Sequence, residues 1–194
     1  VNISSTSQLT IGPGVEIWLS DWASIYSSGV VSAVGTEPEP IVFKGNPESP
    51  NKKWGFISIL NVPDTNRFVH VNIEDASCGE RTREVGAITA YNSNVLFDSV
   101  HFENIYANPI ATRFCKVILR NSLLHSNIVG DLINITRGEG LIENCDFVGN
   151  YLPDNDAIDF NGGSNIILRN CTIRDFFGPN SDGVDLGEIG RAHV

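Results

Sequence analysis

The feature that most constrains this chain is a regular recurrence of short apolar runs through residues 86–188. Equivalent positions in successive runs are 22, 23, 25 and 26 residues apart, and they are Ile88, Ile110, Ile133, Ile158 and Val184. A column of expected corner residues recurs at steps of 23, 23 and 26, and it contains Asp98, Asn121, Asn144 and Asn170. Repeats of this length, built from short strands, are typical of a solenoid.

Each repeat contains about three runs in which apolar and polar residues alternate, as in 157–161, 165–169 and 171–175. Alternation of period two indicates strands. Asn suits a tight corner, because it tolerates left-handed backbone and its amide can bond along the stack. We therefore predict an all-β fold with almost no helix, a single-stranded right-handed parallel β-helix of about seven coils of 22–32 residues, as one domain over 1–194.

The repeats and the opening runs 9–15, 29–36 and 53–59 resemble the pectate-lyase-like right-handed β-helix superfamily. The opening is similar to that of secreted bacterial β-helix proteins, which implies a protein secreted by a bacterium or held at its cell surface. Residues 1–20 are expected to form an N-terminal cap region, and 86–188 the regular coils. Because 187–194 are too few for the remaining strands of that coil, we expect a truncated or uncapped end and favour end-to-end pairing of two copies.

Composition narrows the partners that the chain can have. The net charge is −10, from 23 acidic and 13 basic residues, which argues against nucleic acid because phosphate binding needs a basic face. No run of 18 apolar residues occurs, so no membrane span is expected. The absence of Met from the sequence indicates a processed or trimmed piece.

The cysteines and histidines show no metal-binding spacing, and a zinc site is not predicted. The four cysteines are Cys78, Cys115, Cys145 and Cys171. Cys145 and Cys171 share an inward column, but parallel side-chain vectors disfavour a disulfide, so we predict free thiols. The apolar pattern of 98–104 leaves two alternatives, in which either His101 points inward or the register shifts by one residue.

Carboxylates and amides are the main candidates for a functional site. Since Ile158 and Val184 face inward, the alternating residues Asp159 and Asp185 face outward. On this outward line the candidate ligand-binding residues are Tyr91, Arg113, Asn134, Asp159, Asn161 and Asp185. The turns before it lengthen along the chain and bring in aromatic residues, which suit sugars beside acids. The same face carries the substrate groove in the superfamily that the chain resembles, so we predict a polysaccharide or oligosaccharide partner.

A second acid column, Asp131, Asp156 and Asp182, recurs at steps of 25 and 26 at the corner that enters this strand. Asp at a corner can simply accept backbone N–H bonds and stabilise the turn. Alternatively, the two columns together supply the oxygen ligands that Ca²⁺ prefers. The candidate metal ligands are Asp156, Asp159, Asp182 and Asp185, so the expected cofactor is either none or Ca²⁺.

The run Asn180-Ser-Asp-Gly-Val-Asp185 is similar to the Asn-Thr-Asp-Gly-x-Asp signature of polygalacturonase-type glycosidases. That resemblance implies an acidic catalytic role for Asp182, with Asp185 and Asp159 as further candidates. The family pattern continues with Gly-Asp-Asp on the next coil and then a His, neither of which follows Asp185 here.

Three functions therefore stay open. The first is a carbohydrate-binding surface of a secreted polysaccharide-active or surface protein, which we favour. The second is an active polysaccharide lyase or glycoside hydrolase. The third is a structural or adhesive β-helix without a small ligand.

Overall fold

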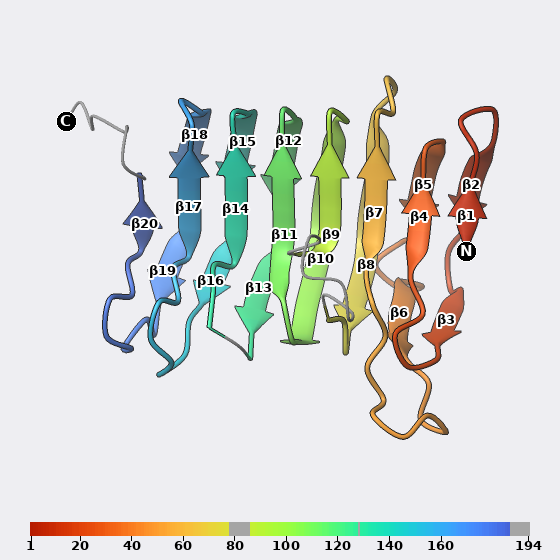
Figure 1. The fold of residues 1–194 in the computed structure, drawn as a ribbon, viewed down its shortest axis with the longest axis horizontal. Helices are drawn as coiled ribbons and strands as arrows, with labels where there is room; N and C mark the ends of the chain where they lie inside the picture. Colours follow the sequence, from red (N-terminus) through yellow and green to blue (C-terminus); the bar gives the residue numbers. More distant parts are fainter. Residues whose placement is uncertain (78–85, 128, 187–194) are drawn as a thin grey trace.

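The alternating runs form short strands that stack turn upon turn in a parallel β-solenoid of about seven turns (Figure 1). The computed structural model describes residues 1–77, 86–127 and 129–186. Every strand pairing within these ranges is parallel, and no helix occurs among them, which confirms the predicted fold class. No described segment is a helix long and apolar enough to cross a membrane.

Three strands per turn build three faces. The first face is one sheet of eight strands: β1 (Asn2–Ile3), β4 (Ile25–Ser27), β7 (Ile57–Leu60), β9 (Gly86–Tyr91), β11 (Asn108–Arg113), β14 (Ile133–Thr136), β17 (Ile158–Asn161) and β20 (Val184–Asp185). The second face contains β2 (Gln8–Ile11), β5 (Val30–Val34), β12 (Lys116–Arg120), β15 (Glu139–Glu143) and β18 (Asn165–Arg169). The third contains β3 (Glu16–Leu19), β6 (Ile41–Gly45), β13 (Leu123–Ser126), β16 (Asp146–Val148) and β19 (Thr172–Arg174). The long strands β8 (Asn66–Glu74) and β10 (Val95–Ile105) belong to both the second and third faces.

The corner between the second and third faces is made by one left-handed residue in each of five successive turns. These residues are His70, Ser99, Asn121, Asn144 and Asn170, with φ angles of 49–55°. The Asn144 amide donates to Asn121 at 3.3 Å, so the expected bonding along the stack is present. The first member of the predicted column was wrong, because Asp98 pairs in register with Arg120 and Ser99 takes the corner position.

This one-residue shift decides the orientation of His101. Phe102 lies opposite Leu124 and is fully buried, whereas His101 is only partly buried and lies opposite Leu123. Burying a phenylalanine in the core stabilises the fold more than placing an Asn at the left-handed corner. The register shift, rather than an inward histidine, is therefore the correct alternative.

The core is a continuous column of aromatic and branched side chains inside the three faces. Its largest fully buried members include Phe43, Trp54, Phe68, Phe97 and Phe147. Phe68 and Phe97, one turn apart, stack with ring centroids 5.4 Å apart. Such stacking on successive rungs requires the strict in-and-out alternation that the sequence shows.

The strands at both ends of the solenoid pair with the adjacent turn. Residues 1–20, expected as a cap region, supply β1, β2 and β3, which pair with the strands of the second turn. At the other end β20 pairs with β17, and 187–194 lie outside the described residues, so end-to-end pairing of two copies stays a prediction.

Cys115, Cys145 and Cys171 are free thiols as expected, and Cys78 lies outside the described residues.

Candidate functional site

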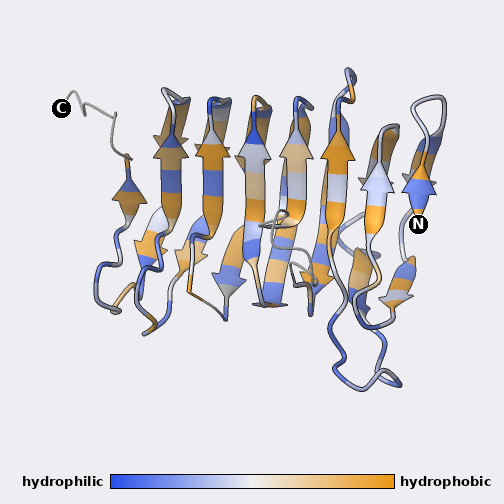
Figure 2. Ribbon diagram, in the orientation of Figure 1, coloured by the Kyte–Doolittle hydropathy of each residue, from blue (hydrophilic) through white to orange (hydrophobic). Residues whose placement is uncertain are grey.

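The outer surface of β14, β17 and β20, together with the turn that enters β14, carries a group of carboxylates and amides. We call it the acid–amide strip, and its members are Asp131, Asn134, Asp159, Asn161 and Asp185. Asn134 pairs with Asp159 and Asp159 with Asp185 on successive turns, as the spacing predicts. The alternating residues Ile133 and Ile158 are fully buried. Figure 2 shows the result as hydrophilic bands that cross the hydrophobic strands β14 and β17.

Hydrogen bonds join the strip across turns. The Asn134 amide Nδ2 lies 3.0 Å from an Asp131 oxygen and 2.6 Å from an Asp159 oxygen, and it donates to both. The Asn161 amide donates to the same Asp159 oxygen at 2.6 Å. Two amides therefore hold the Asp159 carboxylate in place, and the network fixes the positions of the polar groups that face solvent.

Burial in this crowded strip makes two of its carboxyl groups, Asp131 and Asp159, weaker acids. Burial raises the pKa of Asp131 to about 6, opposed by the Asn134 hydrogen bond and assisted by the carboxylates of Asp159 and Asp156. The pKa of Asp159 is also raised, chiefly by burial, against the hydrogen bond from Asn161. Adjacent rungs bring like charges together, and this repulsion favours the protonated form of one of the carboxyl groups.

We expect Asp131→Asn to stabilise the protein at neutral pH. The folded-state pKa of about 6 exceeds the ordinary 3.8, so the Asp131 proton stabilises the fold below pH 3.8, and this contribution is lost as the pH rises through 6. Asparagine keeps an acceptor for Asn134 without the charge. The variant should be more stable by about 1 kcal/mol at pH 7.5, after allowance for solvent screening, with no gain at pH 4.

Urea unfolding at pH 4 and 7.5 measures this difference. The exposed loop residue Asp64 provides the control, because Asp64→Asn removes the same charge away from the strip. A wild type and an Asp131→Asn variant with the same pH dependence between 4 and 7.5 would contradict the assigned burial of Asp131.

In the second acid column, Asp156 stabilises a turn, whereas Asp131 belongs to the acid–amide strip. The Asp182 backbone N–H donates to the Asp156 carboxylate at 2.6 Å. Burial raises the pKa of Asp156, and Asp182 and Asp185 add to that rise. Among the described residues no group of three or more acidic, His or Cys side chains is arranged to hold a metal ion. Ca²⁺ at Asp156, Asp159, Asp182 and Asp185 therefore stays a prediction.

Aromatic side chains lie on the connections that enter the first face. Tyr151 and Phe177 stack with ring centroids 5.1 Å apart and are 79% and 60% exposed. Fully buried Asn155 anchors their connection, since its amide donates to the Gly130 carbonyl at 2.6 Å and its side-chain oxygen accepts the Asn150 N–H at 3.1 Å. These contacts hold an exposed aromatic pair at the end of the strands where the chain enters the strip.

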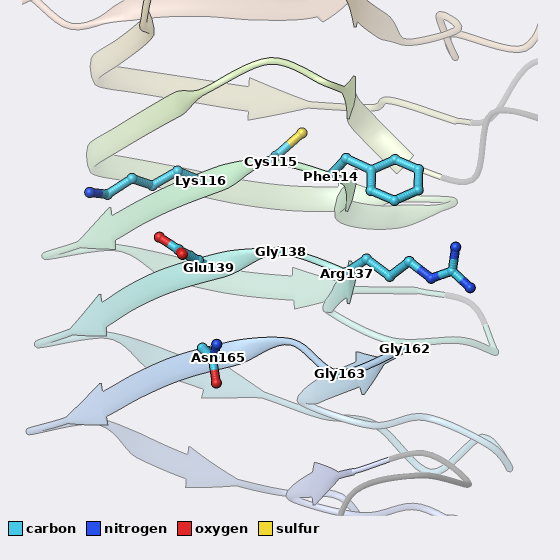
Figure 3. A pocket seen from close by; sticks show the side chains of 9 residues that line it. All are labelled: Phe114, Cys115, Lys116, Arg137, Gly138, Glu139, Gly162, Gly163 and Asn165. Atoms are coloured by element: carbon cyan, nitrogen blue, oxygen red, sulfur yellow. The ribbon is translucent and has the colours of Figure 1, made fainter.

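The opposite corner, where the chain leaves the first face, carries a second cluster. We call it the basic corner, and it consists of Tyr91, Arg113, Phe114 and Arg137. The rings of Tyr91 and Phe114 meet edge to face at 5.6 Å, and the Arg113 and Arg137 guanidinium carbons lie 5.3 and 5.8 Å from the Phe114 centroid. Beside it is a shallow hollow of about 520 Å³, which Phe114, Arg137, Gly162 and Glu139 help to line (Figure 3).

The predicted ligand-binding residues thus divide into two groups. Asn134, Asp159, Asn161 and Asp185 lie in the strip, whereas Tyr91 and Arg113 belong to the basic corner. Sequence reasoning missed Phe114 and Arg137, which follow Arg113 and Thr136 at the end of successive strands. Their position in the corner column of Asn61 and Asn92 is the signal that could have identified them, because corner side chains project outward.

No family model, curated protein or solved structure matches this chain in comparisons with known proteins. The fold itself defines the class, a parallel β-solenoid. This architecture fits a carbohydrate-binding or a structural β-helix.

Proposed function

We propose that this chain is the carbohydrate-binding β-helix of a secreted or cell-surface bacterial polysaccharide-active protein, with the saccharide on the acid–amide strip. Membership of the pectate-lyase-like superfamily is part of this proposal. The single observation that carries it is the network in which Asn134 links Asp131 and Asp159 across two turns. Fixed carboxylates and amides are the groups that exchange hydrogen bonds with sugar hydroxyls, and they act best where their positions are set in advance.

Exposed aromatic rings on both sides of the strip support a sugar ligand. Tyr151 and Phe177 lie at its entering end, and Tyr91 and Phe114 lie at its leaving end. Each is at least 40% exposed, and in each pair the two rings contact one another to form a small apolar surface. The apolar face of a sugar ring can pack on such platforms while its hydroxyls reach the strip.

We expect Asp159→Asn to weaken saccharide binding by about 10–100-fold. The change removes the charge at the centre of the strip, and a hydrogen bond to a charged group contributes about 1.5–3 kcal/mol. A glycan array would identify a binding saccharide, and calorimetry would then give its affinity for both proteins. Asp146→Asn is the matched control, because Asp146 lies on the third face and pairs with Arg174.

Two results would contradict the proposal: no binding to any saccharide of the array, or equal affinity in wild type and Asp159→Asn. Either would leave the structural or adhesive β-helix as the better interpretation. The same samples test Ca²⁺, by comparison of melting temperatures with Ca²⁺ and with a chelator. A rise with Ca²⁺ in wild type that disappears in Asp159→Asn would assign the cation to the strip.

A glycoside hydrolase is the second candidate, and the state of Asp131 favours it. A carboxyl group with a pKa of about 6 can deliver a proton near neutral pH, as the acid of a glycoside hydrolase must. Release of new reducing ends from a bound saccharide, abolished in Asp131→Asn, would establish hydrolysis. Binding without such release would support the non-catalytic function.

A further inference from the structure

The basic corner contains bulky residues where the backbone disfavours them. Phe114 and Arg137 have φ angles of 55° and 52° at a corner that other turns make with Asn61, Asn92 and Gly162. Left-handed backbone is easy for Gly and tolerable for Asn, but it costs a side chain such as Phe about 1 kcal/mol or more. Two adjacent turns accept that cost at the same place, beside a hollow in the surface.

The cations of this corner lack acidic partners, although the chain is strongly acidic. Arg120, Arg169 and Arg174 on the other faces form ion pairs with carboxylates. Within the described residues no carboxylate forms an ion pair with Arg113 or Arg137. Glu139 also lines the hollow, but it lies in register with Lys116 on the neighbouring strand. In a protein of net charge −10, two guanidinium groups on one aromatic ring without an ion-paired carboxylate form a local site for an anion.

The neighbouring residues leave room for these side chains. A Cβ atom at Gly162 would lie 2.7 Å from Arg137 Cγ, so a side chain at 162 would displace the arginine. Figure 3 shows Phe114 and Arg137 projecting in the same direction from successive turns, above Gly162 and Gly163. Arg137 comes three residues after Asn134, which places the corner about 10 Å along the strand from the strip.

We infer that the basic corner binds a single acidic group, a carboxylate or sulfate ester, of a saccharide whose neutral units lie on the acid–amide strip. This inference rests on the proposed function and names its ligand class. Guanidinium groups match the geometry of both acidic groups, and the Phe114 and Tyr91 rings offer a platform for the sugar that carries one. The carboxylates of the strip repel further negative charge, so a polymer with an acid on every unit fits poorly.

The test uses matched saccharide pairs and an Arg137→Asn variant. One pair is xylotetraose and the same tetraose carrying one glucuronic acid, and the other is an agar tetrasaccharide and its monosulfated form. We expect wild type to bind one or both acidic members at least about tenfold more tightly than the neutral ones, and added salt to reduce this preference. Arg137→Asn should abolish the preference without loss of stability, because Asn92 already occupies the equivalent corner.

Arg67→Gln is the charge control, since Arg67 is exposed on β8 and lies away from the corner. The inference is overturned if no acidic probe binds, if acidic and neutral probes bind equally, or if Arg137→Asn keeps the preference. Neutral binding that Asp159→Asn weakens, without any acidic preference, would overturn the inference and leave the proposed function intact. Acidic binding that depends on Arg137 but not on Asp159 would support the corner and overturn the proposed use of the strip.

Discussion

Phe147→Ala is expected to lower the free energy of unfolding by about 3–5 kcal/mol, because it removes a large side chain from the centre of the core. Phe147 is fully buried and lies between Leu124 and Ile173 of the adjacent turns. The cavity would therefore open between three rungs at once, and a solenoid has no other contacts to compensate, because each turn packs only on its neighbours. For a chain of this length the melting temperature should fall by about 6–20 °C.

The control is Val148→Ala, the next residue along β16, which points outward and is only partly buried. We expect a loss below about 1 kcal/mol there, measured by urea unfolding followed by far-UV circular dichroism. Equal losses at 147 and 148 would show that the in-and-out assignment of the third face is incorrect.

Asn155→Ala is expected to lower the free energy of unfolding by about 2–4 kcal/mol and to weaken saccharide binding. The Asn155 side chain satisfies the Gly130 carbonyl and the Asn150 N–H, and alanine leaves both without that partner. These groups hold the connection that carries Tyr151 beside the strip. Loss of the anchor should therefore displace an aromatic platform as well as destabilise the fold.

Asn2→Ala serves as the comparison, since Asn2 is exposed on β1 in the first turn and a surface change of this kind alters stability by at most about 0.5 kcal/mol. Urea unfolding and calorimetry with the saccharide found on the array would measure both effects. An Asn155→Ala variant as stable as wild type would contradict the anchoring role, and a destabilised variant with unchanged affinity would separate the connection from the binding site.

The strand pattern of the first face was predictable because it depends on local alternation alone. Ile133 and Ile158 are apolar and Asn134 and Asp159 polar, so only one orientation buries the core, and the structure has that orientation. The repeat length then places equivalent residues on successive rungs. The fold class, the length of the repeat and the outward position of Asp159 thus follow from the sequence by itself.

Which residue occupies each corner could be determined only from the tertiary structure. An Asn column suggested a corner at Asp98, but the chain places Ser99 there so that Phe102 can enter the core. Left-handed backbone at a corner costs about 1–2 kcal/mol and less for Asn, whereas burial of a phenylalanine contributes about 1.5–3 kcal/mol. Such competition between local and non-local interactions is not visible in the local sequence pattern.

The two parts of the candidate site also depended on packing between turns. The raised pKa of Asp131 results from burial among residues of neighbouring coils, and the basic corner joins Tyr91, Arg113, Phe114 and Arg137 of three successive turns. The sequence by itself determined which strands form and which side chains face outward, because both follow from spacing along one chain. Only the tertiary structure decided which outward side chains meet, because contacts between turns depend on corner geometry and register.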